Sequence, residues 1–196
     1  MKKIFLTLTI LILTFSTQIV ADTSNSIQRI YEGNKDAKVT IITYESLTCG
    51  HCADFHKNVY PQLKKEFIDA GLVKIEFRHF PLDMAALNAS KIAQCNNDGK
   101  SDMLHFLFSN QKEWAIGETV ETANENLKKL LKDENIIIDF EKCTNNQKIE
   151  DYVLHDRIEG VKKFKVNATP TIIINNKKFD KSLNYKNLKK SIEKLI

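Results

Sequence analysis

Residues 38–52 of this 196-residue chain read KVTIITYESLTCGHC, and this stretch decides the fold. Residues 38–45 are rich in β-branched side chains and carry apolar groups on both faces, which is typical of a central strand. Directly afterwards, apolar side chains recur at every fourth residue from Phe55 to Phe67, which predicts a helix. The pair Cys49 and Cys52 is therefore expected at a junction between a strand and a helix.

The next residues extend this unit. Pro61 lies inside the expected helix and predicts a kink near Asn58, and Gly71 is expected to end the helix. Residues 73–80 alternate apolar and polar side chains, which indicates a second strand. The order strand, helix, strand predicts a parallel pair joined by a right-handed crossover.

The remainder of the chain divides into a helical block and a returning sheet segment. Helical patterns occupy residues 83–94, 102–114, 126–132 and 140–161, and only a short isoleucine run at 136–138 resembles a strand. Strands are expected at 171–174 and 177–179, around an Asn175-Asn176 turn that suits positive φ, followed by a helix over 185–195. Residues 22–34 are polar without a period and are expected to be a flexible lead-in.

The first residues bear on the compartment. Met1-Lys2-Lys3 is followed by an uncharged, mostly apolar stretch over residues 4–20 and then by Ala21. This order predicts a signal peptide over residues 1–21, cleaved near Ala21, and hence export to the periplasm. The alternative is an uncleaved membrane anchor, for which so short a stretch would be marginal.

Charge excludes some partners. Residues 1–21 contain Lys2, Lys3 and no acid, so their removal lowers the formal net charge from +4 to +2. A balance this close to neutral gives no support for binding to nucleic acid or to a membrane surface. The remaining chain is long enough for one domain with a sizeable core or for two closely packed subdomains.

The Cys49–Cys52 pair has chemistry suited to its position. Cys49 would lie at the first helical turn, where unpaired N–H groups, the helix dipole and a protonated His51 would stabilise a thiolate. We therefore expect a pKa for Cys49 below the ordinary value of about 8.5. Cys52, one turn later, would be the resolving thiol. The alternatives are a zinc half-site, which lacks a second cysteine pair, and a structural staple, whose loop is too short to stabilise much.

Cys95 and Cys143 complete an even count of four cysteines, for which three pairings are possible. A bridge between these two would close a loop of roughly 48 residues and contribute about 4 kcal/mol in the chain-entropy model. We expect this structural disulfide in an exported chain. Two free buried thiols are the alternative.

A proline and three histidines need separate interpretation. Pro170, just before the strand at 171–174, is either an ordinary loop proline or a cis-proline beside the cysteine pair, where the Thr169 backbone could bind a substrate strand. His79, His105 and His155 lack ligand spacing and are expected to be ordinary residues on surfaces or helix faces. No metal site and no organic cofactor are expected.

Three segments, YESLTCGHCADFH (44–56), RHFPLD (78–83) and VNATPTIIIN (166–175), resemble the DsbA family, most closely its alphaproteobacterial branch. The similarity extends from about residue 39 to residue 196. It implies an α/β protein: a thioredoxin fold, over residues 22–81 and 151–196, interrupted by a helical domain over 82–150.

The resemblance also implies roles for individual residues. Cys49 would be the nucleophile, Cys52 the resolving thiol and Pro170 the cis-proline. The sequence departs from the family at two points: Gly50 replaces the more common proline, and Thr43 stands where the family often has a buried acid. Glu45, two residues later on the same strand face, is our candidate proton acceptor for Cys52.

Together these features predict an exported thiol–disulfide oxidoreductase that introduces disulfides into reduced, unfolded secreted or periplasmic proteins. The resemblance implies reoxidation by a DsbB-like membrane quinone reductase, and we expect a monomer. A disulfide isomerase or reductase on the same fold is the nearest alternative. A periplasmic binding or chaperone module with an incidental cysteine pair is the alternative from another class.

Overall fold

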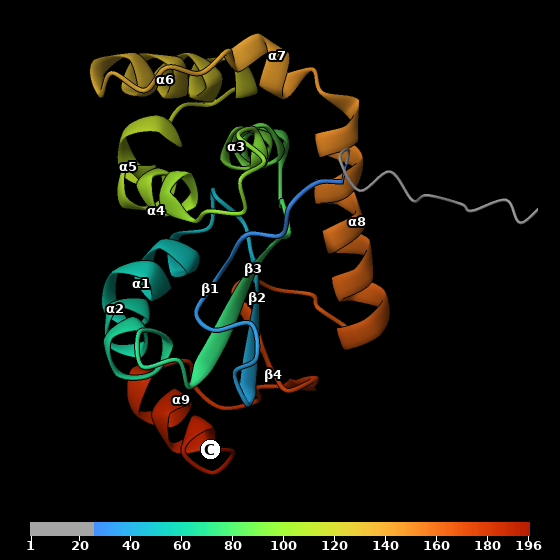
Figure 1. Cartoon of the computed structure of the whole chain (residues 1–196). Helices are drawn as coiled ribbons and strands as arrows, with labels where there is room; N and C mark the ends of the chain where they lie inside the picture. Colours follow the sequence, from blue (N-terminus) through green and yellow to red (C-terminus); the bar gives the residue numbers. More distant parts are fainter. Residues whose placement is uncertain (1–25) are drawn as a thin grey trace, which may run out of the picture.

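A five-stranded sheet lies at the centre of the structure, a computed structural model that describes residues 26–196 (Figure 1). Its spatial order is β1-β3-β2-β4-β5, and only β2 and β3 are parallel. The strands are β1 (Tyr31–Glu32), β2 (Val39–Glu45), β3 (Val73–His79), β4 (Thr171–Ile174) and β5 (Lys177–Lys178). The predicted parallel pair is thus confirmed, with β2 as a central strand.

The predicted signal peptide over residues 1–21 lies outside the described residues. Among residues 26–196, no helix combines the length and apolar character needed to cross a membrane.

The helical segment after β2 is broken where the sequence predicts a kink. Helix α1 (Gly50–Asn58) ends one residue before Val59, and a short α2 (Tyr60–Leu63) follows with its proline in the first turn. A π-helical turn, η2 (Lys64–Ile68), completes the segment. Proline tolerates this first-turn position because the N–H that it lacks would be unpaired there.

The helices after β3 are more divided than the sequence pattern suggests. They are α3 (Met84–Gln94), α4 (Asp102–Ser109), α5 (Gln111–Trp114), α6 (Val120–Asp133), α7 (Phe140–Thr144), α8 (Gln147–Phe164) and α9 (Tyr185–Ile192). The helix expected over 140–161 is two helices, because the Asn146 side chain accepts hydrogen bonds from backbone N–H groups and starts α8. Thr119 starts α6 in the same way, earlier than predicted, and residues 136–138 form no strand.

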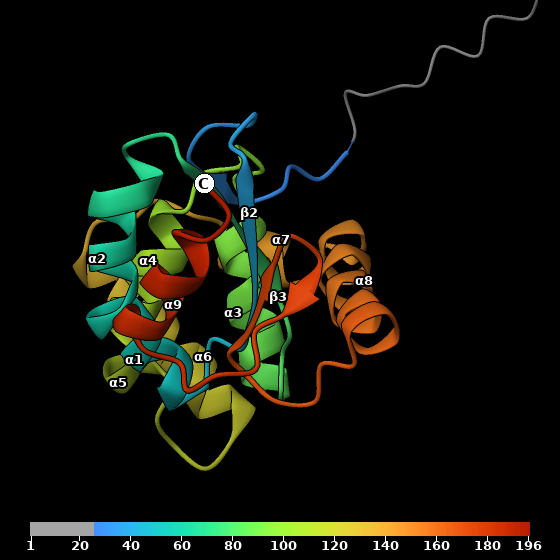
Figure 2. The ribbon, with the colours of Figure 1, turned by 90° about the horizontal axis from the view of Figure 1, so that it is seen from below.

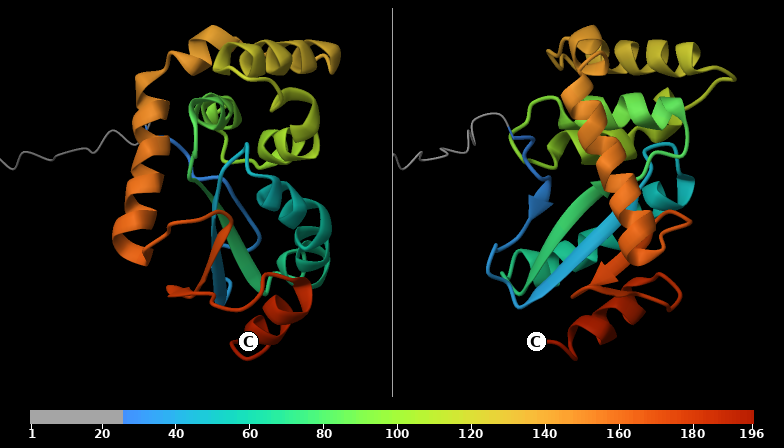
Figure 3. Two further views of the ribbon diagram at one scale, coloured as in Figure 1. Left: turned by 180° about the vertical axis from the view of Figure 1, so that it is seen from behind. Right: turned by 90° about the vertical axis from the view of Figure 1, so that its right-hand side faces the viewer.

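The helices form layers around the sheet. Figure 2 shows β2 and β3 between α8 on one side and α2 and α9 on the other. Both views of Figure 3 place the block α3–α7 beyond one end of the sheet, with α8 running from this block back along the sheet. The predicted boundary at residue 150 falls inside α8, and the division into 22–81, 82–150 and 151–196 stays a prediction.

Helix α8 packs unusually close to the sheet. A Cβ atom added at Gly160 would lie 2.7 Å from a ring carbon of Tyr44, a residue of β2 that is fully buried. Tyr44, Phe80 and Phe164 belong to one apolar cluster on this side of the sheet. Gly160 therefore allows α8 to seat against β2.

The segment before β2 is more ordered than predicted. Ile30 is 2% exposed, and its carbonyl accepts a hydrogen bond from the N–H of Phe77 at 3.0 Å. Gly33 turns the chain with φ +91, where an added Cβ would clash with the carbonyl of Val73. The expectation of a flexible lead-in is wrong for residues 30–33, because β1 pairs with the edge of β3.

Two other expected features are present. Asn175 and Asn176 have φ values of 44° and 65° in the turn between β4 and β5, as predicted. Cys95, at the end of α3, and Cys143, in α7, are joined by a disulfide with a Cα–Cα distance of 5.5 Å. This bridge ties two helices within the block.

Candidate active site

Cys49 and Cys52 lie where β2 passes into α1. Cys49 is the residue that precedes the first helical residue, with extended dihedrals (φ −80°, ψ 117°), and its N–H donates to the carbonyl of Ser46 at 3.0 Å. Cys52 follows one turn into the helix and is 0% exposed, whereas Cys49 is partly exposed. Both are free thiols in this structure. The geometry thus distinguishes an accessible sulfur from an enclosed one.

The surroundings of Cys49 stabilise its thiolate. A hydrogen bond from the Cys52 thiol is the largest cause, and it acts with the Thr169 side chain and the backbone N–H groups of Cys52 and His51 against the effect of burial. Together they lower the pKa of Cys49 to about 5. Cys49 is therefore ionised at neutral pH, the form that attacks disulfides.

The Thr169–Pro170 peptide bond is cis and lies beside this sulfur. Cys49 Sγ is 3.4 Å from the carbonyl oxygen of Thr169. The Thr169 hydroxyl is buried and has no hydrogen-bond partner other than Cys49 within residues 26–196. A thiolate at Cys49 gives this hydroxyl an acceptor, which agrees with its contribution to the low pKa.

Cys52 has the opposite electrostatics. Burial raises its pKa, and the hydrogen bond to Cys49 and the charge of Glu45 act in the same direction. A buried sulfur that resists ionisation must be protonated when it leaves a disulfide and must lose a proton before it attacks one. Proton transfer at Cys52 is therefore a requirement of any exchange reaction at this pair.

A groove of about 880 Å³ opens between residues 51–62, the Thr169–Pro170 segment and residues 183–186. It is lined by His51, Asp54, Phe55, Asn58, Val59, Gln62, Thr169, Pro170, Leu183, Asn184, Tyr185 and Lys186. The side chain of His51 is exposed on this groove, and the contribution that it makes to the Cys49 thiolate comes through its backbone N–H. The groove is bounded by Thr169 and Pro170, and the Thr169 carbonyl lies next to Cys49.

Glu45, the candidate proton acceptor from the sequence, is buried next to His56, which the sequence interpretation passed over. Glu45 and His56 are both buried, and Glu45 Oε2 lies 2.9 Å from His56 Nε2. His56 in turn contacts His105, at 3.1 Å between their Nδ1 atoms. His56 lies one helical turn after Cys52, and this spacing was the available sequence signal. The expectation that His79 lies at a surface is wrong, since it is completely buried and burial lowers its pKa.

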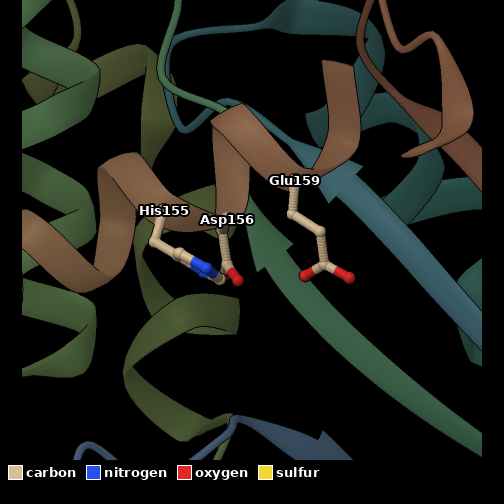
Figure 4. Close-up of side chains that lie close together, drawn as sticks. All are labelled: His155, Asp156 and Glu159. Atoms are coloured by element: carbon tan, nitrogen blue, oxygen red, sulfur yellow. The ribbon is translucent and has the colours of Figure 1, made fainter. Parts of the chain in front are cut away.

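One further cluster of titratable side chains has the spacing of metal ligands. His155, Asp156 and Glu159 lie close together on α8 (Figure 4). Asp156, however, is buried and bonded to Arg29 at 2.6 Å, and Glu159 forms an ion pair with Arg78. Each carboxylate is therefore already neutralised by a guanidinium group, and the cluster fits an ion-pair network that fixes α8 on the sheet.

Known proteins resemble this chain over most of its length. The family model described as Thioredoxin matches residues 25–194. The crystal structure of Wolbachia pipientis alpha-DsbA1 has a TM-score of 0.74 and 30% identity, and the match covers 85% of this chain and 90% of that one. Both comparisons agree with the fold class predicted from the sequence.

Two relatives by sequence have informative names. A putative protein-disulfide oxidoreductase of Rickettsia bellii is 29% identical over 150 residues, which are 73% of this chain and 55% of that protein. Disulfide bond formation protein D of Bacillus subtilis is 28% identical over 180 residues, which are 83% of this chain and 74% of that protein. The chain thus spans little more than half the length of the Rickettsia relative.

Proposed function

Because this chain belongs to the thioredoxin family, and within it to the DsbA proteins, we propose that it is a thiol–disulfide oxidoreductase acting through Cys49 and Cys52. The observation that carries the proposal is the contrast between the two sulfurs. Cys49 is partly exposed with a pKa lowered to about 5, while burial raises the pKa of Cys52. One stable thiolate beside one enclosed thiol is the arrangement that dithiol–disulfide exchange requires.

The exchange follows from this contrast. A substrate thiolate attacks Cys49 Sγ of the oxidised pair, the Cys49–Cys52 bond breaks, and Cys52 leaves and takes up a proton. A second substrate thiolate then attacks the substrate sulfur of the mixed disulfide. The bond to Cys49 breaks, the substrate departs with a new disulfide, and Cys49 remains as a thiolate. Two electrons pass from the substrate to the cysteine pair.

The direction that we propose is oxidation of the substrate. A thiolate with a pKa of about 5 is a good leaving group and stabilises the reduced pair, which makes its disulfide a stronger oxidant. Gly50 and Thr169 keep isomerase or reductase activity as the alternative, since both residues also occur in isomerase-type members of the resembled family. The cis bond before Pro170 supports a role for Thr169 and Pro170 in holding an extended substrate next to Cys49.

We further propose that the substrates are reduced, unfolded exported proteins and that residues 1–21 direct export to the periplasm. The groove combines apolar and polar side chains and has Thr169 in its wall, which suits an extended chain of varied sequence. A DsbB-like membrane quinone reductase is the partner that membership of this family suggests for reoxidation. The chain is proposed to act as a monomer, without a metal or an organic cofactor and without binding nucleic acid.

The reduction potential of the Cys49–Cys52 pair tests this function. It is found by equilibrating the purified protein in graded glutathione buffers. A value in the range of strong thiol oxidants, about −120 to −180 mV, supports disulfide donation. A value near about −270 mV, as in thioredoxin, overturns the oxidase direction and favours the reductase.

A Cys49→Ala variant separates enzyme from binding module. A chaperone or binding module with an incidental cysteine pair keeps its effect on unfolded protein in this variant. An oxidoreductase loses all exchange with glutathione.

A further inference from the structure

A continuous series of hydrogen-bonded, titratable side chains runs from buried Glu45 to the wall of a surface cavity. His56 Nε2 lies 2.9 Å from Glu45 Oε2, and the Nδ1 atoms of His56 and His105 are 3.1 Å apart. His105 Nε2 lies 2.7 Å from Glu32 Oε1. The four groups come from β2, α1, α4 and β1, so tertiary packing alone brings them into line.

Glu45, at the buried end of this hydrogen-bonded series, has a carboxyl oxygen that can accept or give a proton. Glu45 is 4% exposed, and its Oε1 atom is buried without a hydrogen-bond partner in the described part of the chain. Glu45 is close enough to Cys52 for its charge to raise the pKa of that thiol. The backbone N–H of Ser46, the residue after Glu45, bonds the Cys52 sulfur. A buried carboxyl oxygen without a partner is costly, so its place one residue from a contact of the group that must exchange a proton indicates a use.

At its other end the hydrogen-bonded series stops at Glu32, an ionised carboxylate in the wall of a surface cavity. Burial works against ionisation of Glu32, but hydrogen bonds from His105, Ser101, Tyr60 and Lys64 outweigh it and hold its pKa well below the usual range. A cavity of about 470 Å³ opens at this point, with Glu32 and His105 in its wall. The side chain of His105 is 25% exposed, so water in the cavity can reach its ring.

Aromatic rings pack against the two histidines of this hydrogen-bonded series. Phe108 stacks on His56 with a centroid distance of 4.1 Å, and Tyr60 stacks on His105 at 4.5 Å. The ring of Phe77 lies against both imidazoles. The titratable or charged groups that face the two histidines are therefore Glu45 from β2, Glu32 from β1, Tyr60 from α2 and, through Glu32, Lys64 from η2.

We propose that His105 and His56 form a proton relay between water at the surface cavity and Glu45, and that Glu45 exchanges this proton with Cys52. The proposal rests on the proposed function, since only disulfide exchange requires Cys52 to gain and lose a proton. Glu32 stays ionised and supplies the counter-charge for a protonated His105. Glu45 is the group that meets a reacting atom, and the two histidines act through it.

The proton balance of the relay is complete within these groups. At the start Glu45 carries a proton on Oε1, His56 on Nε2, and His105 on both ring nitrogens. As Cys52 leaves the disulfide, Glu45 gives its Oε1 proton to Cys52 Sγ and becomes a carboxylate, whose Oε2 accepts the Nε2–H of His56. His56 takes the Nδ1 proton of His105, which becomes neutral and keeps its Nε2–H bond to Glu32. Reoxidation of the pair reverses the sequence, and His105 then exchanges its recovered Nδ1 proton with water in the cavity.

His105→Gln is the decisive variant, because glutamine keeps a donor at this position but cannot carry a proton through. Oxidised protein is mixed with a single-thiol peptide, and formation of the mixed disulfide is followed by acid quenching and mass spectrometry from pH 5 to pH 9. The peptide thiol ionises in the same way in both experiments, so its pH dependence cancels in the ratio of the two rates. The ratio therefore reports the effect of the relay. His155→Gln, at an exposed site on α8, is the matched control.

The expected result is a rate lowered by about tenfold or more at neutral pH in His105→Gln, the scale of general acid catalysis, with an altered pH profile. Glu45→Gln should give a similar loss, and the double variant no further loss, because both act on one proton. The pKa of Cys49, measured by alkylation of the reduced protein, should stay unchanged in His105→Gln. His155→Gln should match wild type throughout.

A second variant covers the case in which glutamine disturbs the fold. His105→Ala opens space next to the surface cavity, and added imidazole should restore the rate in this variant alone. An unchanged rate and pH profile in His105→Gln, or a loss in His105→Ala that imidazole does not restore, would overturn the relay. If wild type itself fails to form a mixed disulfide, the proposed function fails instead.

Discussion

The sulfur of Cys49 lies 3.4 Å from the carbonyl oxygen of Thr169, a residue 120 positions later in the chain. This contact places a backbone oxygen at the edge of the groove and a buried hydroxyl beside the same sulfur. A single residue thus combines two roles that we propose, positioning of a substrate backbone and stabilisation of a thiolate.

Thr169→Val should raise the pKa of Cys49 above its value of about 5, because the hydroxyl that donates to the thiolate is removed while the shape is kept. The expected rise is about one unit, from the strength of a hydrogen bond to a charged group. The pH dependence of iodoacetamide alkylation measures it. Thr43→Val is the control, since its buried hydroxyl bonds the Glu76 carbonyl instead. Equal curves for Thr169→Val and wild type would contradict the assigned contact.

The reduced protein should gain stability with rising pH relative to Cys49→Ser. The pKa of Cys49 is lowered from 9.0 to about 5 by folding. The stabilisation is therefore complete only above the unfolded value and is lost as the pH falls through about 5. Denaturant titrations from pH 5 to pH 8 should show the difference in unfolding free energy rising by at most about 1.4 kcal/mol per pH unit. A constant difference would mean that Cys49 is not a thiolate.

Replacing both Cys95 and Cys143 by alanine should destabilise the protein by about 2–4 kcal/mol, because the bridge closes a long loop between α3 and α7. The reduction potential of the Cys49–Cys52 pair should stay unchanged, since the bridge lies within the helical block. Thermal unfolding and glutathione equilibration measure the two quantities. A shifted potential would show that the block is coupled to the active site.

Gly160→Ala should lower stability by about 1–3 kcal/mol, because the added methyl group would press α8 off the ring of Tyr44. Gly50→Ala is the matched comparison, as no atom lies within 4 Å of its added Cβ. It should fold with nearly unchanged stability, although its place between the cysteines allows a change of potential. Urea unfolding of both variants would decide, and equal stabilities would refute the packing argument.

The sequence predicted four of the five strands, the thioredoxin fold with its helical block and the position of the cysteine pair. Composition and periodicity are local properties of a sequence. The β-branched residues of β2 and the alternating apolar and polar residues of β3 therefore indicated strands without information about other parts of the chain. Face alternation also placed Glu45 on the side of β2 that meets α1. The cysteine pair could be interpreted because its position relative to a strand and a helix already determines its chemistry.

The residues that were missed depend on contacts between distant elements. The functional relevance of His56 depends on its contacts with Glu45 and with His105 on α4. No sequence spacing predicts that α4 packs next to α1. β1 is two residues long, too short for any period, and is held by its pairing with β3. His79 was misplaced because its burial comes from elements that pack on the end of β3, next to the buried carboxylate of Asp156.

The separation of Cys49 from Thr169 also bears on how the protein matures. A chain synthesised only as far as β3 already holds both reactive cysteines but lacks the loop that donates to Cys49. Closing so long a loop costs entropy that early folding cannot yet recover, so this contact forms late. While the chain is still emerging, its cysteines lack part of the stabilisation that makes Cys49 acidic. We therefore expect the pKa of Cys49 to reach its full lowering only when the segment that contains Thr169 has been added and folded.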